Sequence, residues 1–457
     1  MARDAAIDLP MTLTDPRPTR RIAWFADLET LVGRLDLLSE LHDQIGLTTL
    51  VPESHLSHTS GFAASPEIAA SSPFRDWKTR PGLRDHRRVF GVDEPAMAVL
   101  PGIVGGVDDA PLLAVIDECR RLGIEIWGHA GLWSYGGEVF PELAAVDLFG
   151  RPLLPDSLPW GTMFCPSKPV LNDWVARSLA DAAARYDLDG WFVDHARHTS
   201  PGHGPTLMAC GCADCAAAAG EHGVDLGTCR DDLVALLHDL RQAGPERLVA
   251  LAEGGPTAVL GWLEARPGVL AWFEVRARIL ADRFATLAAA VAAASARRVE
   301  FGSDVFPPGV ALLGGHVYGH WATGATYLTG GFGPKIGWPS VGRVTVTSLA
   351  PWLRALVPGL PDAGALRIVA ALVGADPSPG PDGDLEALLR EIARIAPARR
   401  NLPVYPPVAA TWDAAQLGNI CDAIVDAGLD GAMIAGLEQT SEAQRRVIRS
   451  RLSARLT

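Results

Sequence analysis

Eight short apolar runs alternate with helical patterns along this chain of 457 residues, which predicts an α/β fold with a parallel sheet. Eight is the number of strands that closes a (β/α)8 barrel, also called a TIM barrel. Most of the runs also end in an ionisable residue, as expected where barrel strands deliver side chains to a site at their C-terminal ends. The predicted strands are residues 22–27, 47–53, 124–129, 190–194, 298–304, 325–330, 403–409 and 431–438.

Helical patterns fill the intervals between these runs. In residues 170–186, for example, Val175, Leu179, Ala182 and Ala183 recur at the spacing of one helix face. Two further apolar runs could be strands, but we interpret both as helical, which keeps the strand number at eight. The other predicted helices are residues 31–44, 110–122, 277–294 and 385–395, and the two ambiguous runs are 248–252 and 368–373.

Three segments are too long to be simple connections between a strand and its helix. Residues 54–109 follow the second strand, 199–270 the fourth and 331–384 the sixth. Because all three follow strands, we expect them as insertions at the C-terminal face of one barrel that spans residues 21–457. Residues 1–20 are expected to form a flexible N-terminal tail.

Composition limits the classes of partner and compartment. The net charge of −13 argues against a nucleic-acid or anionic-membrane surface and favours a neutral or cationic small molecule, or a sugar. No run approaches the roughly 18 apolar residues that span a bilayer, and residues 1–20 contain no secretory apolar core. Seven cysteines do not suggest a disulfide framework, so we expect a cytoplasmic protein. No dinucleotide or phosphate-loop motif predicts a nucleotide cofactor, and both a monomer and a homo-oligomer remain open.

The most informative stretch is residues 187–198, Asp-Leu-Asp-Gly-Trp-Phe-Val-Asp-His-Ala-Arg-His. A tight Asp-Gly turn leads from the preceding helix into three apolar residues and then Asp194. A buried parallel strand presents a catalytic carboxylate at its C-terminal end in this way. A salt-bridged aspartate at a strand end fits the same pattern, and both interpretations stay open.

Strand parity nominates the rest of the site. Side chains alternate between the faces of a strand, so an inward-facing Asp194 has counterparts at the ends of most other strands. Carboxylates gathered in one cleft raise one another's pKa, which leaves one protonated acid beside one carboxylate, the pair that glycoside hydrolysis requires. The sequence predicts catalytic roles for Asp194, Asp304 and Glu438, and substrate binding by Asp27, Glu53, His129, Arg197, His198 and Tyr405.

The two leading aspartates are expected to differ in protonation. Asp304 is followed by two apolar residues, Val305 and Phe306, and an apolar setting favours the neutral acid. Asp194 is followed by Arg197 and histidines, whose donors favour the carboxylate. We therefore predict Asp304 as the proton donor and Asp194 as the ionised partner.

Residues 189–197, the Cys-x-Cys-x-x-Cys motif at 210–215 and residues 302–307, Gly-Ser-Asp-Val-Phe-Pro, resemble glycoside-hydrolase-like TIM-barrel proteins of bacteria. These proteins are distantly similar to the α-amylase-type hydrolases. The resemblance implies a barrel that acts on glycosides. It also implies that Asp194 matches the strand-4 nucleophile and that Asp304 occupies the strand-5 position of the acid/base.

The chain departs from the α-amylase pattern at both strands. That pattern has a glutamate where this chain has Asp304, and an arginine where it has Phe192. The roles implied by the resemblance therefore need evidence from the site itself.

Three thiols lie within six residues, Cys210, Cys212 and Cys215, and Cys229 follows fourteen residues later. Such spacing can close a tetrahedral Zn site, so we predict a structural zinc held by these four cysteines. The same motif occurs in the zinc site of family 42 β-galactosidases. Cys165 or a histidine is an alternative fourth ligand, and reduced cysteines that only pack a helix at 216–222 are the alternative to any metal.

Two other function classes remain beside a glycosidase that cleaves or rearranges a glycosidic bond. One is a carbohydrate-binding barrel without catalysis. The other is a metal-dependent hydrolase or isomerase, in which His195, His198 and His203 would bind a metal with Asp194. Bound metal would distinguish the last class, and activity on glycosides would separate a catalyst from a binder.

Overall fold

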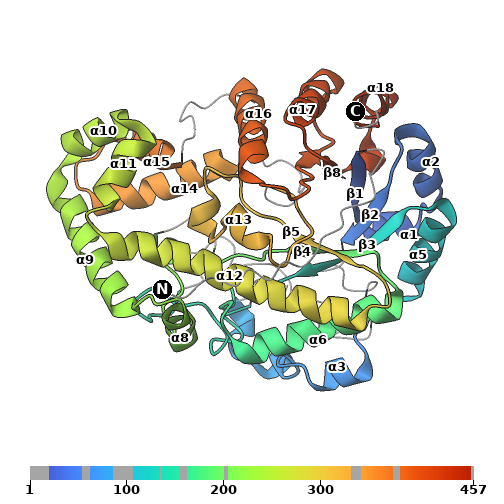
Figure 1. Ribbon diagram of the computed structural model, residues 1–457, viewed down its shortest axis with the longest axis horizontal. Coiled ribbons are helices and arrows are strands. Elements are labelled where there is room, and N and C mark those ends of the chain that lie inside the picture. The colour runs from blue at the N-terminus through green and yellow to red at the C-terminus, as the bar shows by residue number, and fades with distance from the viewer. Residues whose placement is uncertain are drawn as a thin grey trace, which may run out of the picture.

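The computed structural model describes residues 20–53, 62–85, 107–133, 136–153, 162–199, 204–330, 341–373 and 381–453. In this part of the chain, eight parallel strands form one curled sheet with helices packed around it (Figure 1). Their order is β6-β5-β4-β3-β2-β1-β8-β7. The predicted α/β class with a parallel eight-stranded sheet is therefore confirmed. The strands are β1 Arg21–Asp27, β2 Thr49–Glu53, β3 Glu125–Gly131, β4 Gly190–Asp194, β5 Glu300–Ser303, β6 Tyr327–Leu328, β7 Pro407–Ala409 and β8 Gly431–Ala435.

The two edges of the sheet are joined by a parallel bridge between Leu328 of β6 and Val404. The Leu328 N–H donates to the Pro403 carbonyl at 3.0 Å, and the Tyr405 N–H donates to the Leu328 carbonyl at 2.9 Å. The sequence predicted one strand over residues 403–409. The structure begins β7 only at Pro407, and Pro406 before it has no N–H to donate to a ladder.

Helices surround the sheet and agree with most of the predicted positions. The 110–122 prediction matches α5, and the two ambiguous apolar runs lie within α10 and α15, as interpreted. The helix predicted at 31–44 is two helices in the structure, because α1 ends at Val32, with Gly33 as its C-cap. The helices are α1 Leu28–Val32, α2 Asp36–Ile45, α3 Pro66–Ala70, α5 Ala110–Leu122, α6 Pro169–Tyr186, α7 Gly204–Leu207, α8 Ala213–Glu221, α9 Leu226–Ala243, α10 Pro245–Glu253, α11 Gly255–Leu263, α12 Pro267–Ala294, α13 Tyr318–Trp321, α14 Val341–Leu356, α15 Asp362–Val373, α16 Pro381–Ala398, α17 Ala414–Asp426 and α18 Glu442–Leu452; short 3-10 turns are η1 Trp77–Thr79, η4 Ala311–Gly314 and η5 Leu437–Gln439.

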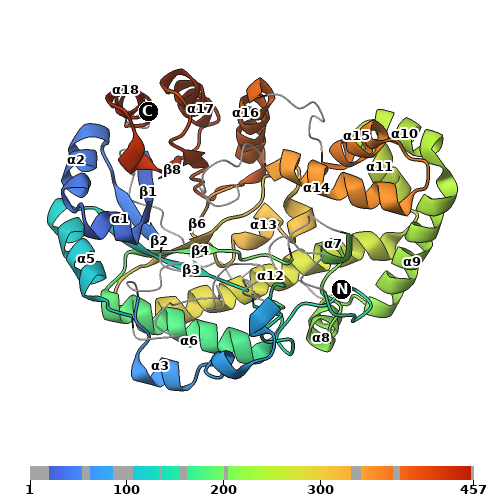
Figure 2. The same cartoon turned by 180° about the vertical axis from the view of Figure 1, so that it is seen from behind.

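The segments predicted as insertions contain helices of their own. Residues 199–270 include α7 to α11, and residues 331–384 include α14 and α15. From both sides, α10, α11, α14 and α15 form a group at the end of the molecule away from β1 and β2 (Figures 1 and 2). The N-terminal tail predicted for residues 1–20 lies outside the described residues except for Arg20. None of the described helices has the length and apolar character needed to cross a bilayer.

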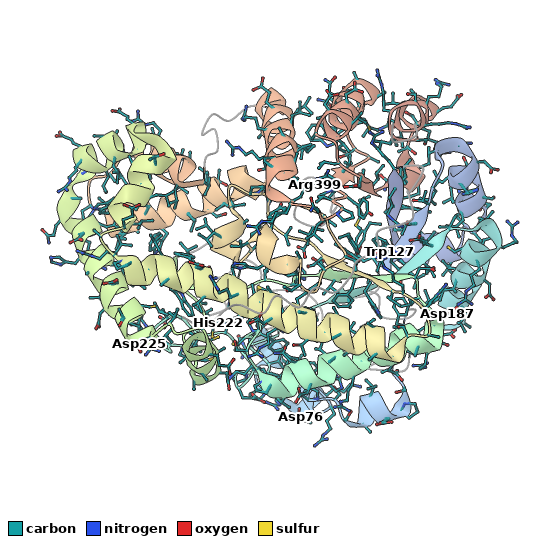
Figure 3. The ribbon with its side chains drawn as sticks, viewed as in Figure 1. Asp76, Trp127, Asp187, His222, Asp225 and Arg399 are labelled. Atoms are coloured by element: carbon teal, nitrogen blue, oxygen red, sulfur yellow. The ribbon has the colours of Figure 1, made fainter. Side chains whose placement is uncertain are left out.

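Large aromatic rings fill the space inside the curled sheet, and glycines on neighbouring strands make room for them. Trp127 pairs in register with Gly190, and Tyr327 pairs with Gly302 (Figure 3 labels Trp127). A Cβ on Gly190 would lie 2.7 Å from the Trp127 indole, and one on Gly302 would lie 2.5 Å from the Tyr327 ring. The interior cluster consists of Ala23, Phe25, Val51, Trp127, Phe192, Tyr327, Tyr405 and Met433.

Gly302→Ala is expected to destabilise the protein by about 1–3 kcal/mol, because the new methyl group overpacks a buried ring that cannot withdraw into solvent. Thermal unfolding of the variant should therefore begin at a lower temperature. Gly33→Ala is the control, since a Cβ there meets no atom within 4 Å and φ is −81°. Equal unfolding temperatures for the two variants would contradict this account of the interior.

Candidate active site

Carboxylates from several strands meet at one end of the sheet because the strands are parallel. Asp27 and Glu53 end β1 and β2 and are register partners. Asp194 ends β4 opposite Gly131 of β3, and Asp304 follows Ser303, which ends β5 beside Val193. The sequence parity argument placed these four carboxylates at the same end.

Asp194 and Asp304 are joined by one backbone N–H. The amide of His195 donates to Asp194 Oδ1 at 2.8 Å and to Asp304 Oδ1 at 3.0 Å. His195 has a φ of 62°, in the left-handed region that non-glycine residues seldom adopt. Such a conformation costs free energy, and it is often found at functional sites. Here it lies at the residue whose N–H links the two acids.

The surrounding groups are cationic or can become so. Arg197 Nη1 lies 3.6 Å from Asp304 Oδ2, and His129 Nε2 lies 3.8 Å from Asp194 Oδ2. The side-chain Nε2 of His195 lies 3.7 Å from Asp194 Oδ1. All five residues are buried, so their charges interact with little screening by solvent.

The two aspartates have different environments. Burial, and after it the negative charge of Asp194, raise the pKa of Asp304 well above its usual value, and the nearby Arg197 offsets this rise only in part. Ser303 Oγ lies 3.3 Å from Asp304 Oδ1 and 2.7 Å from the Val193 carbonyl. Burial beside Asp194 therefore favours the neutral acid at Asp304.

The other predicted acids at this end are more exposed. Asp27 is the N-cap of α1 and accepts from the N–H groups of Glu29 and Thr30, so helix capping alone accounts for its position. Glu438 lies in η5 and accepts from Trp24 Nε1 at 3.3 Å. Glu53 is half-buried at the end of β2.

Two predicted substrate-binding residues lie away from the aspartates. His198 Nε2 lies 3.3 Å from the Arg276 carbonyl of α12, and burial lowers the pKa of His198 well below its usual value. Tyr405 lies in the interior cluster, with its ring 5.5 Å from the guanidinium of Arg21, which begins β1. Asp27, by contrast, ends that strand, so the structure gives Tyr405 a packing position deeper in the sheet. His203 lies outside the described residues.

Four thiols from the segments that follow β3 and β4 lie close together. The sulfur atoms of Cys165, Cys210, Cys212 and Cys215 all lie within 4.8 Å of one another. Cys165 Sγ is 3.5 Å from Cys212 Sγ and 3.3 Å from Cys215 Sγ, too far for disulfide bonds. These separations approach the roughly 3.8 Å between sulfurs of a tetrahedral Zn site with ~2.3 Å bonds.

The fourth thiol of this group is Cys165, the alternative considered from the sequence, and Cys229 is not part of it. Cys229 is buried on α9. Cys165 reaches the group because its N–H donates to the Leu143 carbonyl, in a loop where Ala144 bridges Phe164. Contacts between such distant segments leave no spacing motif in the sequence.

Two cations flank the thiol group. Lys168 Nζ lies 2.8 Å from the carboxylate of Asp214. Asp214 lies between Cys212 and Cys215 in the sequence. The Arg276 side chain is fully buried, and its Nη1 donates to the Leu207 carbonyl at 2.7 Å, whereas Nε and Nη2 have no acceptor. Burial lowers the pKa of Arg276 to about 9, and charge on Cys215 acts in the opposite direction. The fold has therefore placed a buried guanidinium beside four sulfurs.

Sequence reasoning missed the backbone N–H of His195 and the hydroxyl of Ser303 as parts of the aspartate site. Neither has a residue-type signal, since the first is a main-chain group and the second is a common small polar residue. Among the described residues, the only group of ligand atoms close enough to hold a metal together is the four thiols.

No protein-family model and no curated protein matches the chain. Among solved structures, the glycoside hydrolase domain of PgaB (BpsB) from Bordetella bronchiseptica is similar with a TM-score of 0.48 and 11% identity, over 95% of this chain and 99% of that one. A β-galactosidase from Marinomonas ef1 gives 0.47 and 10%, over 94% and 58%. A chitinase from Chromobacterium violaceum gives 0.41 and 9%, over 95% and 99%. These matches are distant, so the chemistry below is derived from the side chains of this chain alone.

Proposed function

We propose that this protein cleaves or rearranges a glycosidic bond with Asp194 and Asp304 as its working pair. The observation that carries the proposal is the shared N–H of His195, which holds two buried carboxyl groups together, while burial raises the pKa of Asp304. One protonated and one ionised carboxyl group is the arrangement that glycoside hydrolysis needs.

In the proposed reaction Asp304 gives its proton to the glycosidic oxygen as the bond to the anomeric carbon breaks. Asp194 attacks that carbon and forms a covalent ester, which water then hydrolyses while Asp304 takes back a proton. Two oxygens that accept from one N–H at 2.8 and 3.0 Å lie within about 6 Å of each other. This upper limit lies below the about 6.5–9.5 Å that inversion uses, so we propose retention of configuration, which uses more closely spaced carboxyl groups.

The other residues at this end of the sheet are proposed to bind the sugar or to orient the pair. Arg197 lies 3.6 Å from Asp304 and His129 lies 3.8 Å from Asp194, so we assign both to orienting the carboxyl groups. Glu53, Asp27 and Glu438 are nearer to solvent and can accept hydrogen bonds from sugar hydroxyls. Because Asp194 and Asp304 are only 3% and 1% exposed, a sugar reaches them only when covering residues move.

The first test is hydrolysis of a panel of aryl glycosides that differ in sugar and anomeric configuration. Release of the aryl alcohol by the wild-type protein supports the enzyme. Saturable sugar binding without release identifies a non-catalytic carbohydrate-binding barrel instead. A metal bound by Asp194 and the nearby histidines, with activity that disappears when that metal is removed, identifies a metal-dependent hydrolase or isomerase.

The raised pKa of Asp304 predicts the pH dependence. Only the protonated acid can donate, so kcat/KM should fall as the pH rises through the raised pKa of Asp304. The folded state holds this proton more tightly than the unfolded chain, so the contribution of Asp304 to stability also falls as pH rises above its ordinary pKa. Asp304→Asn should therefore lower kcat by about 10²–10⁴-fold while leaving stability near pH 7 unchanged or higher. A variant that keeps the alkaline decline in activity would contradict this role.

We also propose that Cys165, Cys210, Cys212 and Cys215 hold one structural Zn²⁺. Four sulfurs from two distant segments, three in buried residues and one in the half-buried Cys212, match the donor set and number of a closed zinc site. Four thiolates and one Zn²⁺ carry a net charge of about −2. The unpartnered Nε and Nη2 of buried Arg276, together with Lys168, support an anionic centre at this position. Such an ion would fasten the loop after β3 to the loop after β4, next to Asp194.

A further inference from the structure

We propose that His316 is a positioning residue that fixes the loop of Asp304 against the loop of Asp194 and Arg197. The inference rests on the proposed roles of these aspartates, because it assigns His316 the task of holding them in register. His316 lies between η4 and α13, outside every segment that the sequence singled out.

The ring of His316 bridges the two loops through both of its nitrogens. The Phe306 N–H, two residues after Asp304, donates to His316 Nδ1 at 2.9 Å. A neutral imidazole that accepts at Nδ1 carries its proton on Nε2. The Nε2 atom lies 2.9 Å from the Ala196 carbonyl, one residue before Arg197, and therefore donates to it.

One further contact ties the same two segments together, and a second fastens the loop of Asp304 to α13. The His198 N–H donates to the Gly314 carbonyl at 3.1 Å, and the Tyr318 hydroxyl donates to the Phe306 carbonyl at 3.1 Å. The Phe306 ring lies 5.3 Å from the His316 ring and 5.5 Å from the Arg197 guanidinium. The ring of His316 thus stands between the backbones that carry the three charged groups of the site.

Close packing leaves His316 little freedom to change partner. A Cβ on Gly314 would lie 2.3 Å from the Phe306 ring, so this turn approaches the ring closely only because it lacks a side chain. His316 is 1% exposed and also packs against Trp321, at 5.4 Å between ring centroids. The main-chain N–H and carbonyl that it bonds belong to the buried residues Phe306 and Ala196.

His316 stays neutral throughout the pH range in which an enzyme works. Burial, and then the cations Arg197 and Arg276 that act on the ring, lower the pKa of His316 to about 3, although the bond to Ala196 raises it. A permanently neutral ring keeps one donor and one acceptor nitrogen, as the bridge requires. Its hydrogen bonds go to the main chain of Phe306 and Ala196, so its effect on the reaction passes through the placement of other residues.

Three variants test this role. His316→Phe keeps an aromatic ring but loses both hydrogen bonds, and we expect kcat to fall about 10²-fold, the effect of a misplaced catalytic group. His316→Asn keeps an acceptor near Nδ1 for Phe306, and His316→Gln keeps a donor near Nε2 for Ala196, so each should retain more activity than the phenylalanine variant. The matched control is His42→Phe. It removes the hydrogen bond between His42 Nδ1 and the carbonyl of Leu47, which precedes β2.

The decisive readout is the titration of Asp304, followed by ¹³C NMR of labelled aspartate carboxyl groups, with Asp304→Asn to assign the signal. In His316→Phe, Asp304 should move away from Asp194 and toward water, so its pKa and the alkaline limb of kcat/KM should both fall by about one unit or more. Loss of stability alone would lower the amount of folded protein. It would leave the pKa of Asp304 and the alkaline limb of kcat/KM unchanged.

The outcomes separate this proposal from the proposed function. Unchanged kcat, alkaline limb and Asp304 titration in His316→Phe would overturn the positioning role while leaving the glycosidase intact. If the phenylalanine variant does not fold, the same three measurements on His316→Asn decide. A wild-type protein that cleaves no glycoside, but whose Asp304 titration moves in the variant, would overturn the proposed function and leave the positioning role standing.

Discussion

Asp194→Asn is expected to lower kcat by at least about 10³-fold on every glycoside that the wild-type protein cleaves. The neutral amide lacks the negative charge of the carboxylate, so its oxygen is too weak a nucleophile to attack the anomeric carbon as Asp194 would. It still accepts the His195 N–H, so the variant should fold normally. Initial rates on the active aryl glycosides, with circular dichroism to check folding, measure the effect.

The leaving group distinguishes the two aspartates. An aryl alcohol with a low pKa departs without protonation, so Asp304→Asn should lose less activity on such substrates than on poor leaving groups. Asp194→Asn should lose activity on both. Asp173→Asn, on the exposed side of α6, is the control for an amide substitution and should keep wild-type rates. Near-normal rates for both site variants would refute the pair and make Glu53 and Glu438 the next candidates.

Cys165→Ser is expected to abolish stoichiometric zinc and to lower the free energy of unfolding by at least about 3 kcal/mol. The Cys165 sulfur lies 3.5 Å from that of Cys212 and 3.3 Å from that of Cys215. A hydroxyl group is a poor substitute for a thiolate at a closed zinc site. The loop after β3 would then lose its link to the loop after β4. Elemental analysis of the purified protein and thermal unfolding with and without a chelator measure both effects.

Cys229→Ser is the matched control, because Cys229 is an equally buried thiol that lies outside the group. It should keep one zinc per chain and lose only the small packing contribution of a thiol. Protein that contains no metal, and in which Cys165→Ser and Cys229→Ser unfold alike, would leave four reduced cysteines that pack a loop.

The strand pattern predicted the fold well where strands are long and buried on both faces. β4 begins and ends at the predicted residues, because the Asp-Gly turn before it and the polar cluster after it are both visible in the sequence. The predicted strand at 325–330 shrinks to Tyr327–Leu328. A two-residue strand is defined by its neighbours' hydrogen bonds, which no local pattern encodes.

The candidate site was predictable only as far as strand alternation reaches. Asp194 and Asp304 lie together because they end adjacent parallel strands, and parity fixes their face. Alternation stops at the left-handed His195, so it could not show that His198 turns toward α12. Alternation also does not show at which level along the strands a side chain lies. Tyr405 lies beside Arg21 at the start of β1, whereas the prediction placed it near Asp27 at the end of that strand.

Covalent labelling of Asp194 tests the central claim most directly. A glycoside from the active series with fluorine in place of its 2-hydroxyl group should slow both steps, because the transition states resemble an oxocarbenium ion. Mass spectrometry should then find the sugar on Asp194, in the peptide that contains residues 187–199. Proton NMR of the wild-type reaction should show a first product of retained configuration. Inverted product, or a label on a carboxylate other than Asp194, would contradict the account.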